Sequence, residues 1–536
     1  MVTLTIDNKE VQVEPGTTIL RAAEKLGIFI PHYCYHPSLS IAGSCRMCLV
    51  EVEGAPREAI ACNQPVGEGM VVHTDSERVK RAREIVLEFL LLNHPLDCPV
   101  CDKAGECLLQ DYSFNYGTSH SRFDEQKRVP PFKDLGPNIM LATTRCILCT
   151  RCTRFMDEIA GDAQLTVVNR GYHNQIEVAK NTRLDHPLAG NVVDICPVGC
   201  LLDKNFIHRT RVWHLEATPS VCGECSAGCN TLIDSHRDEI YRIRPRFNAE
   251  VNDHWICDTG RYAYKKYAAV ERLVSAHRRE VGSLVETDLK EALEEINNRF
   301  GKYTKTADSI AVLISPYAVN ENVFAVKHAF KELMNSHSVT GLFRRPAGED
   351  REFRSGFVIK GDTFPNQAGL QYILGLEQPD YGAQSVVEKI KSGAIKAAYV
   401  IHNDLSEISE DLLDILKKLD FLVVEEITAS PLTAVADIVL PGKLHFEDSG
   451  TYMNYRKRLQ LLERAVMGPA GTLSTWEIME ELSALKNNRF KWTSAAGLFL
   501  MMAQAYPDFE GLSHFRMDKA GHLPGRKTAV EEQVEN

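Results

Sequence analysis

The second half of this chain lacks cysteine altogether: all sixteen cysteines of the 536 residues lie at or before Cys257. The sequence also lacks the G-x-G-x-x-G and G-x-x-x-x-G-K-[ST] loops, so it offers no common site for a dinucleotide or a nucleoside triphosphate. Its most apolar stretches, residues 85–92 and 495–503, fall far short of the roughly 20 residues that a membrane span needs. The first residues show neither the basic nor the apolar segment of a signal peptide. We therefore expect a soluble protein that is not exported.

An excess of acidic side chains limits the partners that the sequence favours. Asp and Glu number 72 against 61 Lys and Arg, which gives a net charge of −11. Nucleic-acid-binding domains are usually basic, so this balance argues against a nucleic-acid partner. The length is that of roughly three to four domains, and 44% of hydrophobic residues is enough for several cores.

The cysteines form four groups with short internal spacings. Cytoplasmic cysteines stay reduced, and the C-x2-C spacing there indicates metal binding rather than disulfides. In such a pair both thiolates point to one side of a tight loop, whose backbone N–H groups can donate to bridging sulfides. Zinc uses the same spacing, so a single pair does not distinguish zinc from an iron–sulfur cluster. The candidate ligands are Cys34, Cys45, Cys48 and Cys62; His94, Cys98, Cys101 and Cys107; Cys146, Cys149, Cys152 and Cys196; and Cys222, Cys225, Cys229 and Cys257.

The first two groups predict different clusters. The first lies in a long loop of a small expected β-sheet, which favours a [2Fe–2S] ferredoxin-like module with a longer first gap than the plant-type C-x4-C. Gly43 is expected to let the backbone approach the ligand loop closely. The second group has only three cysteines, and His94, just before Pro95 and one turn before Cys98, is the candidate fourth ligand. A neutral imidazole in place of a thiolate makes reduction easier.

The third and fourth groups each predict a [4Fe–4S] cluster. The third is a C-x2-C-x2-C run with a remote Cys-Pro, and Met156 stands where a two-cluster ferredoxin has another cysteine. Cys200 is expected to be a buried, inert thiol rather than a spare ligand. Arg145, Arg151 and Arg154 flank this group, either to offset cluster charge or as a solvated surface. Zinc is a serious rival for the fourth group only when that group is taken alone.

Local patterns predict the secondary structure around these groups. Residues 2–7 and 11–14 alternate apolar and polar side chains around Asn8-Lys9, which predicts a β-hairpin. Further expected elements are a helix over 19–26 capped by Thr17 or Thr18 and ending at Gly27, strands over 49–53 and 70–73, an amphipathic helix capped by Ser76, and a loop-rich stretch over 110–144.

The back half predicts an α/β layer. Strand-like runs at 310–315, 397–401 and 421–424 alternate with helical segments at 320–333 and 412–419, which indicates a largely parallel sheet. The polar tail from about residue 520 is expected to be mobile.

With its four groups in this order, the chain resembles the large iron–sulfur subunit (the G subunit) of NADH-quinone oxidoreductase, respiratory complex I. The resemblance covers residues 1 to about 265 closely. The motifs that carry it are Asn93-His94-Pro95, the Cys98 to Cys101 turn, residues 134–137 before Arg145-Cys146, Cys196-Pro197-Val198-Gly199, and residues 257–261.

The back half resembles a shortened molybdopterin-oxidoreductase domain, through residues 433–441, 447–451 and 454–460. Arg456-Lys457 replaces the Glu-Gly that usually precedes the arginine of that family's motif. No cysteine is available there for molybdenum, although Ser or Asp ligation stays open, and about 270 residues are too few for the catalytic subunit. The resemblance implies a structural relic, and we expect no molybdenum cofactor.

The predicted fold is an α+β front, with a ferredoxin-like β-grasp and small cluster-binding domains, followed by a truncated α/β molybdopterin-oxidoreductase-like domain. The expected domains are 1–75 ([2Fe–2S] ferredoxin-like), 76–140 ([4Fe–4S] with one histidine and three cysteine ligands), 141–214 ([4Fe–4S] ferredoxin-type), 215–270 (molybdopterin-oxidoreductase-type [4Fe–4S]), 271–520 (the shortened α/β domain) and a mobile tail at 521–536.

The resemblance implies an electron-relay subunit of a proton-pumping NADH:quinone oxidoreductase, with one [2Fe–2S] and three [4Fe–4S] clusters and no substrate or catalytic site of its own. The first three clusters would lie on the path from a flavin-bearing NADH-oxidising subunit to quinone-site hydrophilic subunits, and the fourth would be mainly structural. We expect a peripheral place on the cytoplasmic side of the inner membrane, with no membrane span and no nucleic-acid partner.

Three alternatives remain. An electron-transfer subunit of a soluble NAD-linked hydrogenase or formate dehydrogenase shares the ferredoxin-like front, but often carries an eight-cysteine pair of clusters or a further catalytic metal motif that this chain lacks. A standalone molybdenum enzyme is disfavoured by the short back half. The third alternative is a zinc-stabilised scaffold without a redox role.

Overall fold

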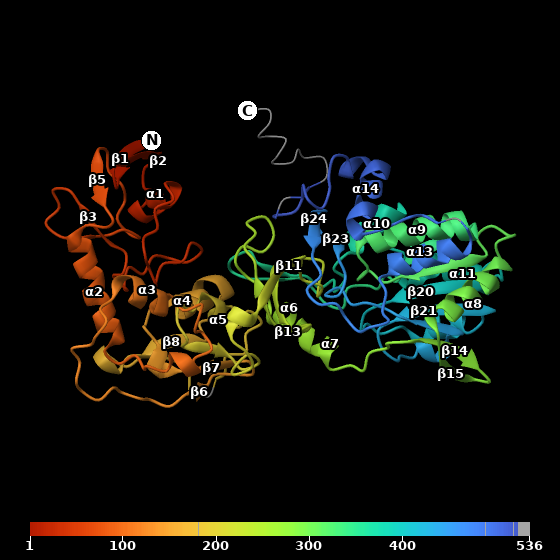
Figure 1. Cartoon of the computed structure of the whole chain (residues 1–536), viewed down its shortest axis with the longest axis horizontal. Coiled ribbons are helices and arrows are strands. Elements are labelled where there is room, and N and C mark those ends of the chain that lie inside the picture. Colours follow the sequence, from red (N-terminus) through yellow and green to blue (C-terminus); the bar gives the residue numbers. More distant parts are fainter. Residues whose placement is uncertain (181, 488, 518, 524–536) are drawn as a thin grey trace. The chain divides into compact units, whose positions relative to one another are not determined.

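The computed structural model describes residues 1–180, 182–487, 489–517 and 519–523, and the chain forms two compact units (Figure 1). Unit 1 comprises residues 1–215 together with 353–356, and unit 2 comprises residues 216–352 and the chain after residue 356. From residue 524 on, the tail predicted at 521–536 lies outside the described residues.

Unit 1 begins with a five-stranded sheet and one helix, in the strand order β2-β1-β5-β3-β4. β1 is antiparallel to β2 and parallel to β5, which is the predicted β-grasp arrangement. Leu4, Ile6, Val13 and Ile19 lie in its core. The elements are β1 (Val2–Ile6), β2 (Lys9–Val13), α1 (Ile19–Lys25), β3 (Leu49–Val52), β4 (Ala59–Ile60) and β5 (Met70–His73).

A long amphipathic helix, α2 (Glu77–Leu91), connects this sheet to the second cysteine group. As predicted, Ser76 is its N-cap, and the serine hydroxyl accepts from the Val79 backbone N–H at 3.3 Å. Pro95 disfavours helical backbone at the residue before it, so the helix ends close to His94.

Short elements separated by loops make up the rest of unit 1, with a three-stranded sheet β10-β7-β6 and a hairpin β8-β9. The cysteines of the second and third groups therefore lie on loops and element ends. The elements are η1 (Cys98–Val100), α3 (Leu108–Tyr116), β6 (Lys133–Asp134), β7 (Ile139–Leu141), η2 (Thr143–Arg145), α4 (Arg151–Arg154), η3 (Phe155–Ala160), β8 (Leu165–Val168), η4 (Gly171–His173), β9 (Gln175–Val178), α5 (Asn191–Ile195), β10 (Leu201–Asp203) and η5 (Val212–His214).

Unit 2 starts with a three-stranded antiparallel sheet that carries the fourth cysteine group. Its strands are β11 (Glu216–Val221), β12 (Asn230–His236) and β13 (Glu239–Pro245), followed by α6 (Asp258–Arg261) and α7 (Ala263–Ala268). Cys222 follows β11 directly, Cys229 precedes β12, and Cys257 is the N-cap of α6.

A seven-stranded sheet in the order β15-β14-β22-β21-β20-β16-β17 forms the centre of unit 2. The strands from β22 to β17 are parallel, as predicted, and β14 and β15 extend the edge antiparallel. The strands are β14 (Ala276–Glu280), β15 (Ser283–Thr287), β16 (Ile310–Ile314), β17 (Val339–Gly341), β20 (Ala397–His402), β21 (Phe421–Glu426) and β22 (Ile438–Pro441).

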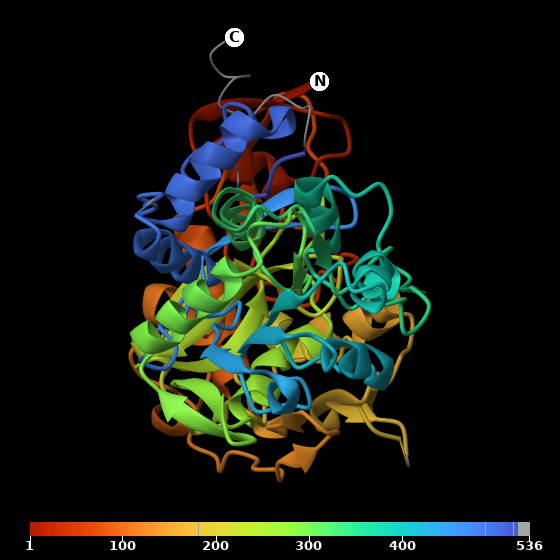
Figure 2. The ribbon, with the colours of Figure 1, turned by 90° about the vertical axis from the view of Figure 1, so that its right-hand side faces the viewer.

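Helices cover both faces of this sheet (Figure 2), because its central strands are apolar on both sides. Ile310, Val312 and Ile314 pack into one core, while Ala311 and Leu313 pack into the other. The helices are α8 (Leu289–Gly301), α9 (Asn320–Met334), α10 (Gln367–Leu374), α13 (Thr475–Leu485) and α14 (Ala495–Ala505) on the first face, and α11 (Gln384–Lys391) and α12 (Glu410–Leu416) on the second. The remaining elements are β18 (Arg351–Glu352), β19 (Val358–Ile359), η6 (Tyr381–Ala383), η7 (Thr433–Val435), β23 (Gly450–Met453), β24 (Leu459–Leu462) and η8 (Pro507–Phe509).

Two local predictions need correction. The first hairpin turns at Asp7 and Asn8, which have positive φ values of 47° and 64°, so β2 already begins at Lys9. The stretch expected to be loop-rich from residue 110 starts inside a helix, α3, which follows Cys107 and buries Leu109 and Tyr112. Packing of these two side chains stabilises a helix whose apolar pattern is too short to be recognised in the sequence.

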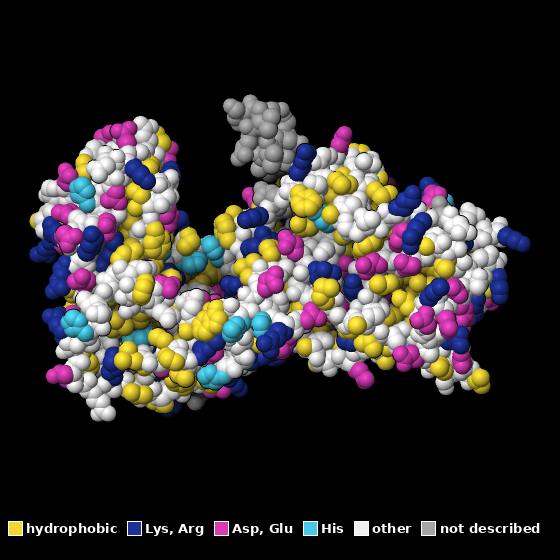
Figure 3. All heavy atoms as spheres, in the orientation of Figure 1, with side chains coloured by type: hydrophobic (Ala, Val, Ile, Leu, Met, Phe, Trp, Pro, Cys, Tyr) yellow, Lys and Arg dark blue, Asp and Glu magenta, His cyan; other side chains and the backbone are white. Residues whose placement is uncertain are grey.

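Among the described residues, no helix is long and apolar enough to cross a membrane. On the face drawn in Figure 3, basic side chains are interspersed with acidic ones.

Candidate iron–sulfur sites

The first cysteine group comes together in the β-grasp sheet. Cys34 and Cys45 lie in the loop between α1 and β3, Cys48 directly precedes β3, and Cys62 follows β4. Thiol hydrogen bonds link Cys34 to Cys45 and to Cys62, and Cys48 to Cys62. The structure therefore connects all four predicted thiols.

Left-handed backbone shapes the loop that carries Cys45. Gly43 and Arg46 have φ values of 59° and 60°. A Cβ atom on Gly43 would have no neighbour within 4 Å among the described residues, so the expected close approach of the backbone stays a prediction. The glycine supplies a positive φ at low energetic cost.

The thiols of the first site cannot all ionise without a cation. The hydrogen bond with Cys45 lowers the pKa of Cys34, while the bonds with Cys34 raise the pKa values of Cys45 and Cys62. The hydrogen bond with Cys62 also lowers the pKa of Cys48. Two thiols therefore ionise more easily while the other two stay protonated, because like charges repel in a buried site. A metal centre removes this limit by deprotonating the thiols that bind it. The four side chains thus fit a cationic cluster.

The three cysteines of the second group lie between α2 and α3. Cys98 is exposed, whereas Cys101 and Cys107 are buried. Burial raises the pKa of Cys107, and the backbone N–H groups of Leu109 and Gln110 at the start of α3 oppose this effect. Such N–H donors favour a thiolate and tune the potential of an iron–sulfur cluster.

His94 has the protonation state that a metal ligand needs. Burial lowers its pKa to about 4, so the ring is neutral at physiological pH. The charged groups that act on the ring are Asp97, Lys127 and Arg145. His94 therefore lies in the loop of the second group, but no interaction in the described structure joins its ring to the thiols.

The third group is assembled from three segments. Cys146 follows η2, Cys149 lies in a loop with positive φ at Leu148 and Thr150, and Cys152 lies in α4. Cys196 follows α5, and electrostatic interactions connect it to the other three thiols. The structure brings the four predicted ligands into one buried region.

Cys200 joins the third group. It is buried, as expected, and its thiol hydrogen-bonds to those of Cys146 and Cys196. This contact lowers the pKa of Cys196 to about 6. The spacing between Cys196 and Cys200 alone does not indicate such a contact.

All four cysteines of the fourth group are buried. The Cys222 backbone N–H donates to the Cys229 carbonyl at 2.8 Å, and the Gly260 N–H donates to Cys257 Sγ at 3.4 Å. A Cβ atom on Gly260 would lie 2.7 Å from Cys222 Sγ, so only glycine fits there. Burial raises the pKa of each thiol, and that of Cys257 reaches about 12.

Within the part of the chain that the structure describes, no three His, Cys, Asp or Glu side chains are grouped as ligands of a single metal ion. In a [4Fe–4S] cluster each cysteine binds its own iron atom, so the ligands surround the group rather than converge on one point.

Polar contacts tie the second and third cysteine loops together. Arg145, beside Cys146, is only 4% exposed and pairs with Asp97, beside Cys98, at 2.6 Å between Nη2 and Oδ2. A Cβ atom on Gly199 would overlap the sulfur of Cys101, so the loop after Cys196 passes directly beside a ligand of the second group.

Arg154 ties the first and third cysteine loops together. Its Nη2 donates to the Cys34 carbonyl at 2.6 Å and to the Cys149 carbonyl at 3.2 Å. Arg145 and Arg151 are buried, so a solvated surface is the wrong interpretation for these two arginines.

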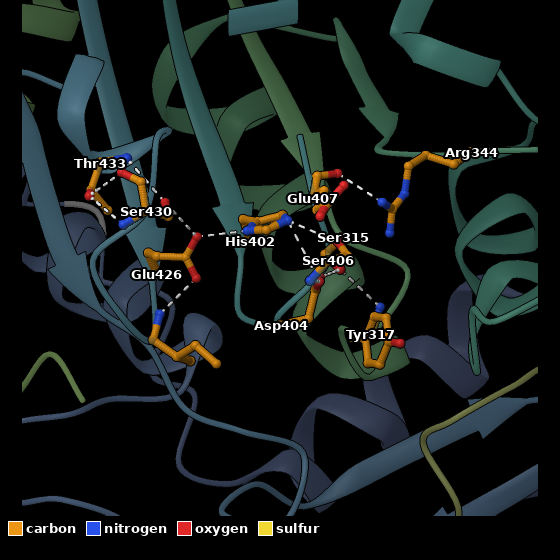
Figure 4. A network of polar contacts seen from close by, with 11 residues as sticks. Ser315, Tyr317, Arg344, His402, Asp404, Ser406, Glu407, Glu426, Ser430 and Thr433 are labelled. Carbon is orange, nitrogen blue, oxygen red and sulfur yellow. Dashed lines mark hydrogen bonds and ion pairs between the residues drawn. The ribbon is translucent and has the colours of Figure 1, made fainter. Parts of the chain in front are cut away.

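A polar cluster that sequence reasoning missed lies at the carboxyl ends of parallel strands in unit 2 (Figure 4). His402, the last residue of β20, bonds through Nδ1 to Glu426 Oε2 at 2.7 Å and through Nε2 to Ser406 Oγ at 3.0 Å. Asp404 Oδ1 lies 3.6 Å from His402 Nε2, and Asp404 accepts from the Ser315 hydroxyl. In the sequence, the only sign of this cluster was that polar and charged residues directly follow the apolar runs 397–401 and 421–424.

The charges of this cluster compensate one another. Burial lowers the pKa of His402, but Asp404 and Glu426 outweigh it and raise the pKa to about 9. A Ser–His–carboxylate arrangement also occurs in hydrolases, where a neutral histidine accepts the serine proton. A protonated His402 cannot accept the Ser406 proton, so the cluster fits a structural role.

The crevice beside this cluster is almost filled. β17 lies on one side of β16 and the next strand of the sheet, β20, lies on the other, so the strand order reverses at β16. Open α/β sheets bind their ligands at such a switch point. A cavity of about 20 Å³ remains there, room for about one water molecule. Its lining includes Ser315, Asn322, Asn403, Lys443, His445 and Asp448.

Family models match the segments that carry these sites. The matches are "2Fe-2S iron-sulfur cluster binding domain" at 1–77, "NADH-ubiquinone oxidoreductase-G iron-sulfur binding region" at 83–122, "NADH-quinone oxidoreductase subunit 3, ferredoxin-like domain" at 136–202, "NADH-ubiquinone oxidoreductase NDSU1/NuoG-like, 4Fe-4S domain" at 215–265, and "Molybdopterin oxidoreductase" at 364–485.

Relatives of known name agree with these matches. The mitochondrial 78 kDa subunit of NADH-ubiquinone oxidoreductase from Candida albicans is 30% identical over 94% of this chain and 85% of its own length. The chain belongs to the G-subunit family of NADH-quinone oxidoreductase. The G subunit of NADH-quinone oxidoreductase from Rickettsia bellii is 39% identical over 80% of this chain, which spans 63% of that relative's length. A chain of an NAD⁺-reducing [NiFe]-hydrogenase is 35% identical, with a TM-score of 0.36, over 39% of this chain and 91% of its own.

Membership in the G-subunit family confirms the resemblance and the predicted fold class: ferredoxin-like iron–sulfur domains precede a molybdopterin-oxidoreductase-like α/β domain. The family matches also confirm that [2Fe–2S] and [4Fe–4S] binding domains are present. The exact ligands, the number of clusters and the division into five domains and a tail stay predictions.

Proposed function

We propose that this chain is the iron–sulfur electron-relay subunit of an NADH:quinone oxidoreductase, with one [2Fe–2S] cluster at the first site and a [4Fe–4S] cluster at each of the other three. When bound, these clusters supply one-electron transfer. The chain's own residues hold them, shield them from water and tune their potentials through N–H donors and nearby charges. The ligands are the fifteen cysteines and His94 named from the sequence, with Cys200 left outside the set.

The observation that carries this proposal is the set of contacts joining the cysteine loops of unit 1. Arg154 links the loops of the first and third sites, and Arg145 with Asp97 links those of the third and second. The Leu108 N–H, beside Cys107, also donates to the Pro197 carbonyl, beside Cys196, at 3.0 Å. These contacts support a spatial order in which the third site lies between the first and the second.

The fourth site and the α/β domain have another role in this proposal. The fourth cluster is mainly structural, because its four ligands join β11, β12 and α6 of unit 2. The α/β domain carries no molybdenum cofactor, since its crevice retains only about 20 Å³ and is occupied by the chain's own polar side chains.

The partners follow from the family. We propose a flavin-bearing NADH-oxidising subunit as the electron donor and quinone-site hydrophilic subunits of the same complex as acceptors. The chain would then lie at the cytoplasmic side of the inner membrane as a peripheral part of the complex, without a substrate site of its own.

Metal analysis of the anaerobically purified protein tests this function. We expect a brown protein with about 14 iron atoms per chain, an equal amount of acid-labile sulfide and negligible zinc. A colourless protein with stoichiometric zinc would contradict the relay. Stoichiometric molybdenum or tungsten would instead favour a catalytic role for the α/β domain.

A further inference from the structure

Arg151 occupies an unusual position between two cysteine sites. It begins α4, between Cys149 and Cys152 of the third site, and is only 8% exposed. A buried guanidinium stays charged and loses its hydration, so it needs compensating partners. Its partners show what the residue does.

The Arg151 guanidinium binds one carbonyl from each of two sites. Nη2 donates to the carbonyl of Tyr35, which follows Cys34 of the first site. Nη1 donates at 3.2 Å to the carbonyl of Ile195, which precedes Cys196 of the third site. The planar guanidinium fixes these two donors relative to each other, so it also fixes the separation of the two carbonyls.

The same guanidinium acts electrostatically on both sites. The thiols that interact most strongly with its charge are Cys149 and Cys196 of the third site, and Cys34 and Cys45 of the first. Arg151 Nε is buried and has no hydrogen-bond partner among the described residues. A free N–H donor beside sulfur ligands fits a thiolate or sulfide acceptor, the kind of contact that raises the potential of a cluster.

We infer that Arg151 is a shared positioning residue, which holds the first and third sites at a fixed separation and stabilises the reduced state of both clusters. This inference rests on the proposed function, because it requires clusters at both sites. Reduction adds negative charge to a cluster, and a buried positive charge nearby makes that addition more favourable. One residue therefore raises two neighbouring potentials together.

Redox titration of the intact complex, followed by electron paramagnetic resonance, tests this inference. In Arg151→Gln we expect both midpoint potentials to fall, each by roughly a tenfold change in the reduction equilibrium, or about 59 mV for one electron. In Arg151→Lys the charge remains but one ammonium cannot bind both carbonyls in the same geometry, so both potentials should fall by less. Arg122→Gln removes an exposed charge of unit 1, paired with Glu88, and should change neither.

Different outcomes of this titration test the shared role of Arg151 and the proposed electron-relay function separately. Unchanged potentials in Arg151→Gln, or a shift at one site only, would overturn the shared role while both clusters remain visible. Absence of the two signals in the unmodified protein would overturn the proposed function instead. If Arg151→Gln does not assemble, Arg151→Lys decides: both potentials must fall together, and a shift of one or of neither contradicts the inference.

Discussion

The cysteine sites of unit 1 and the carboxyl edge of the unit 2 sheet both bury ionisable groups, but they compensate them differently. At the first site the thiols force one another's pKa values apart, and nearby Arg151 keeps an unpartnered donor among the described residues. At the sheet edge His402 is charged. Glu426 accepts its hydrogen bond, and Glu426 and Asp404 together offset its charge. The sheet edge thus offsets its buried positive charge with the chain's own carboxylates, whereas the cysteine sites fit a cationic cofactor.

Iron removal should affect the two regions most differently. In protein produced without iron, we expect the cysteine loops within residues 27–62, 94–107 and 142–200 to lose most of their protection from hydrogen exchange, because thiols that cannot ionise together no longer have a cation. Strands β16, β20 and β21 should stay protected. Mass spectrometry of exchange in loaded and iron-free chains measures both. Loss of protection in the sheet to the same extent would contradict the difference between the two regions.

A matched pair of buried thiols tests the ligand assignment at the third site. Cys149→Ser should lower the iron content by about four atoms per chain, since it removes a cluster ligand. Cys200→Ser, which changes an equally buried thiol in the same region, should leave the iron content unchanged. Iron analysis of both variants decides, and a loss of iron from Cys200→Ser would make Cys200 a ligand.

The compensation in the sheet can be broken without touching iron. Glu426→Gln leaves the His402 imidazolium without its closest carboxylate, and we expect the unfolding free energy of the α/β domain to fall by about 3 to 5 kcal/mol. Exchange in β20 and β21 during urea unfolding measures this loss. Glu410→Gln, an exposed acidic residue at the start of α12, is the control and should change it little. A fall in iron content would contradict the separation of the two regions.

The same cluster makes the stability of the sheet depend on pH. The pKa of His402 is raised to about 9, above the unfolded value of about 6.5. The charge of His402 therefore contributes to the unfolding free energy in full below about pH 6.5, and this contribution is lost as the pH rises through about 9. The contribution is at most about 3 kcal/mol. Urea unfolding between pH 6 and 10 should show this decline, and His402→Gln should flatten it. An equal slope in the variant would assign the decline to other groups.

The smallest expected effect is at the second site. His94→Cys should keep a cluster and lower its midpoint potential, because a thiolate adds a negative charge where a neutral imidazole was. A redox titration followed by electron paramagnetic resonance measures the shift, and Cys98→Ser shows the loss of signal expected from a damaged site. An unchanged potential in His94→Cys would count against His94 as a ligand.

The features that could be predicted from the sequence are those that depend on local spacing. The short C-x2-C runs, the Ser76 cap of α2 and the apolar runs of the parallel strands were predictable, because each follows from residues close together in the chain. The bridges made by Arg151 and Arg154 were not, since they join residues more than a hundred positions apart. His402 was missed for a similar reason: its partner Glu426 comes from another strand, and only the pairing of β20 with β21 brings them together.

Mössbauer spectroscopy of the anaerobically purified, iron-57-labelled chain distinguishes the cluster types, whereas metal analysis counts only the iron. We expect iron in one [2Fe–2S] and three [4Fe–4S] clusters per chain. We also expect that all of this iron can be removed under conditions that leave the unit 2 sheet folded. Mononuclear iron only, or a chain that folds fully with zinc at these sites and no cluster signal, would contradict it.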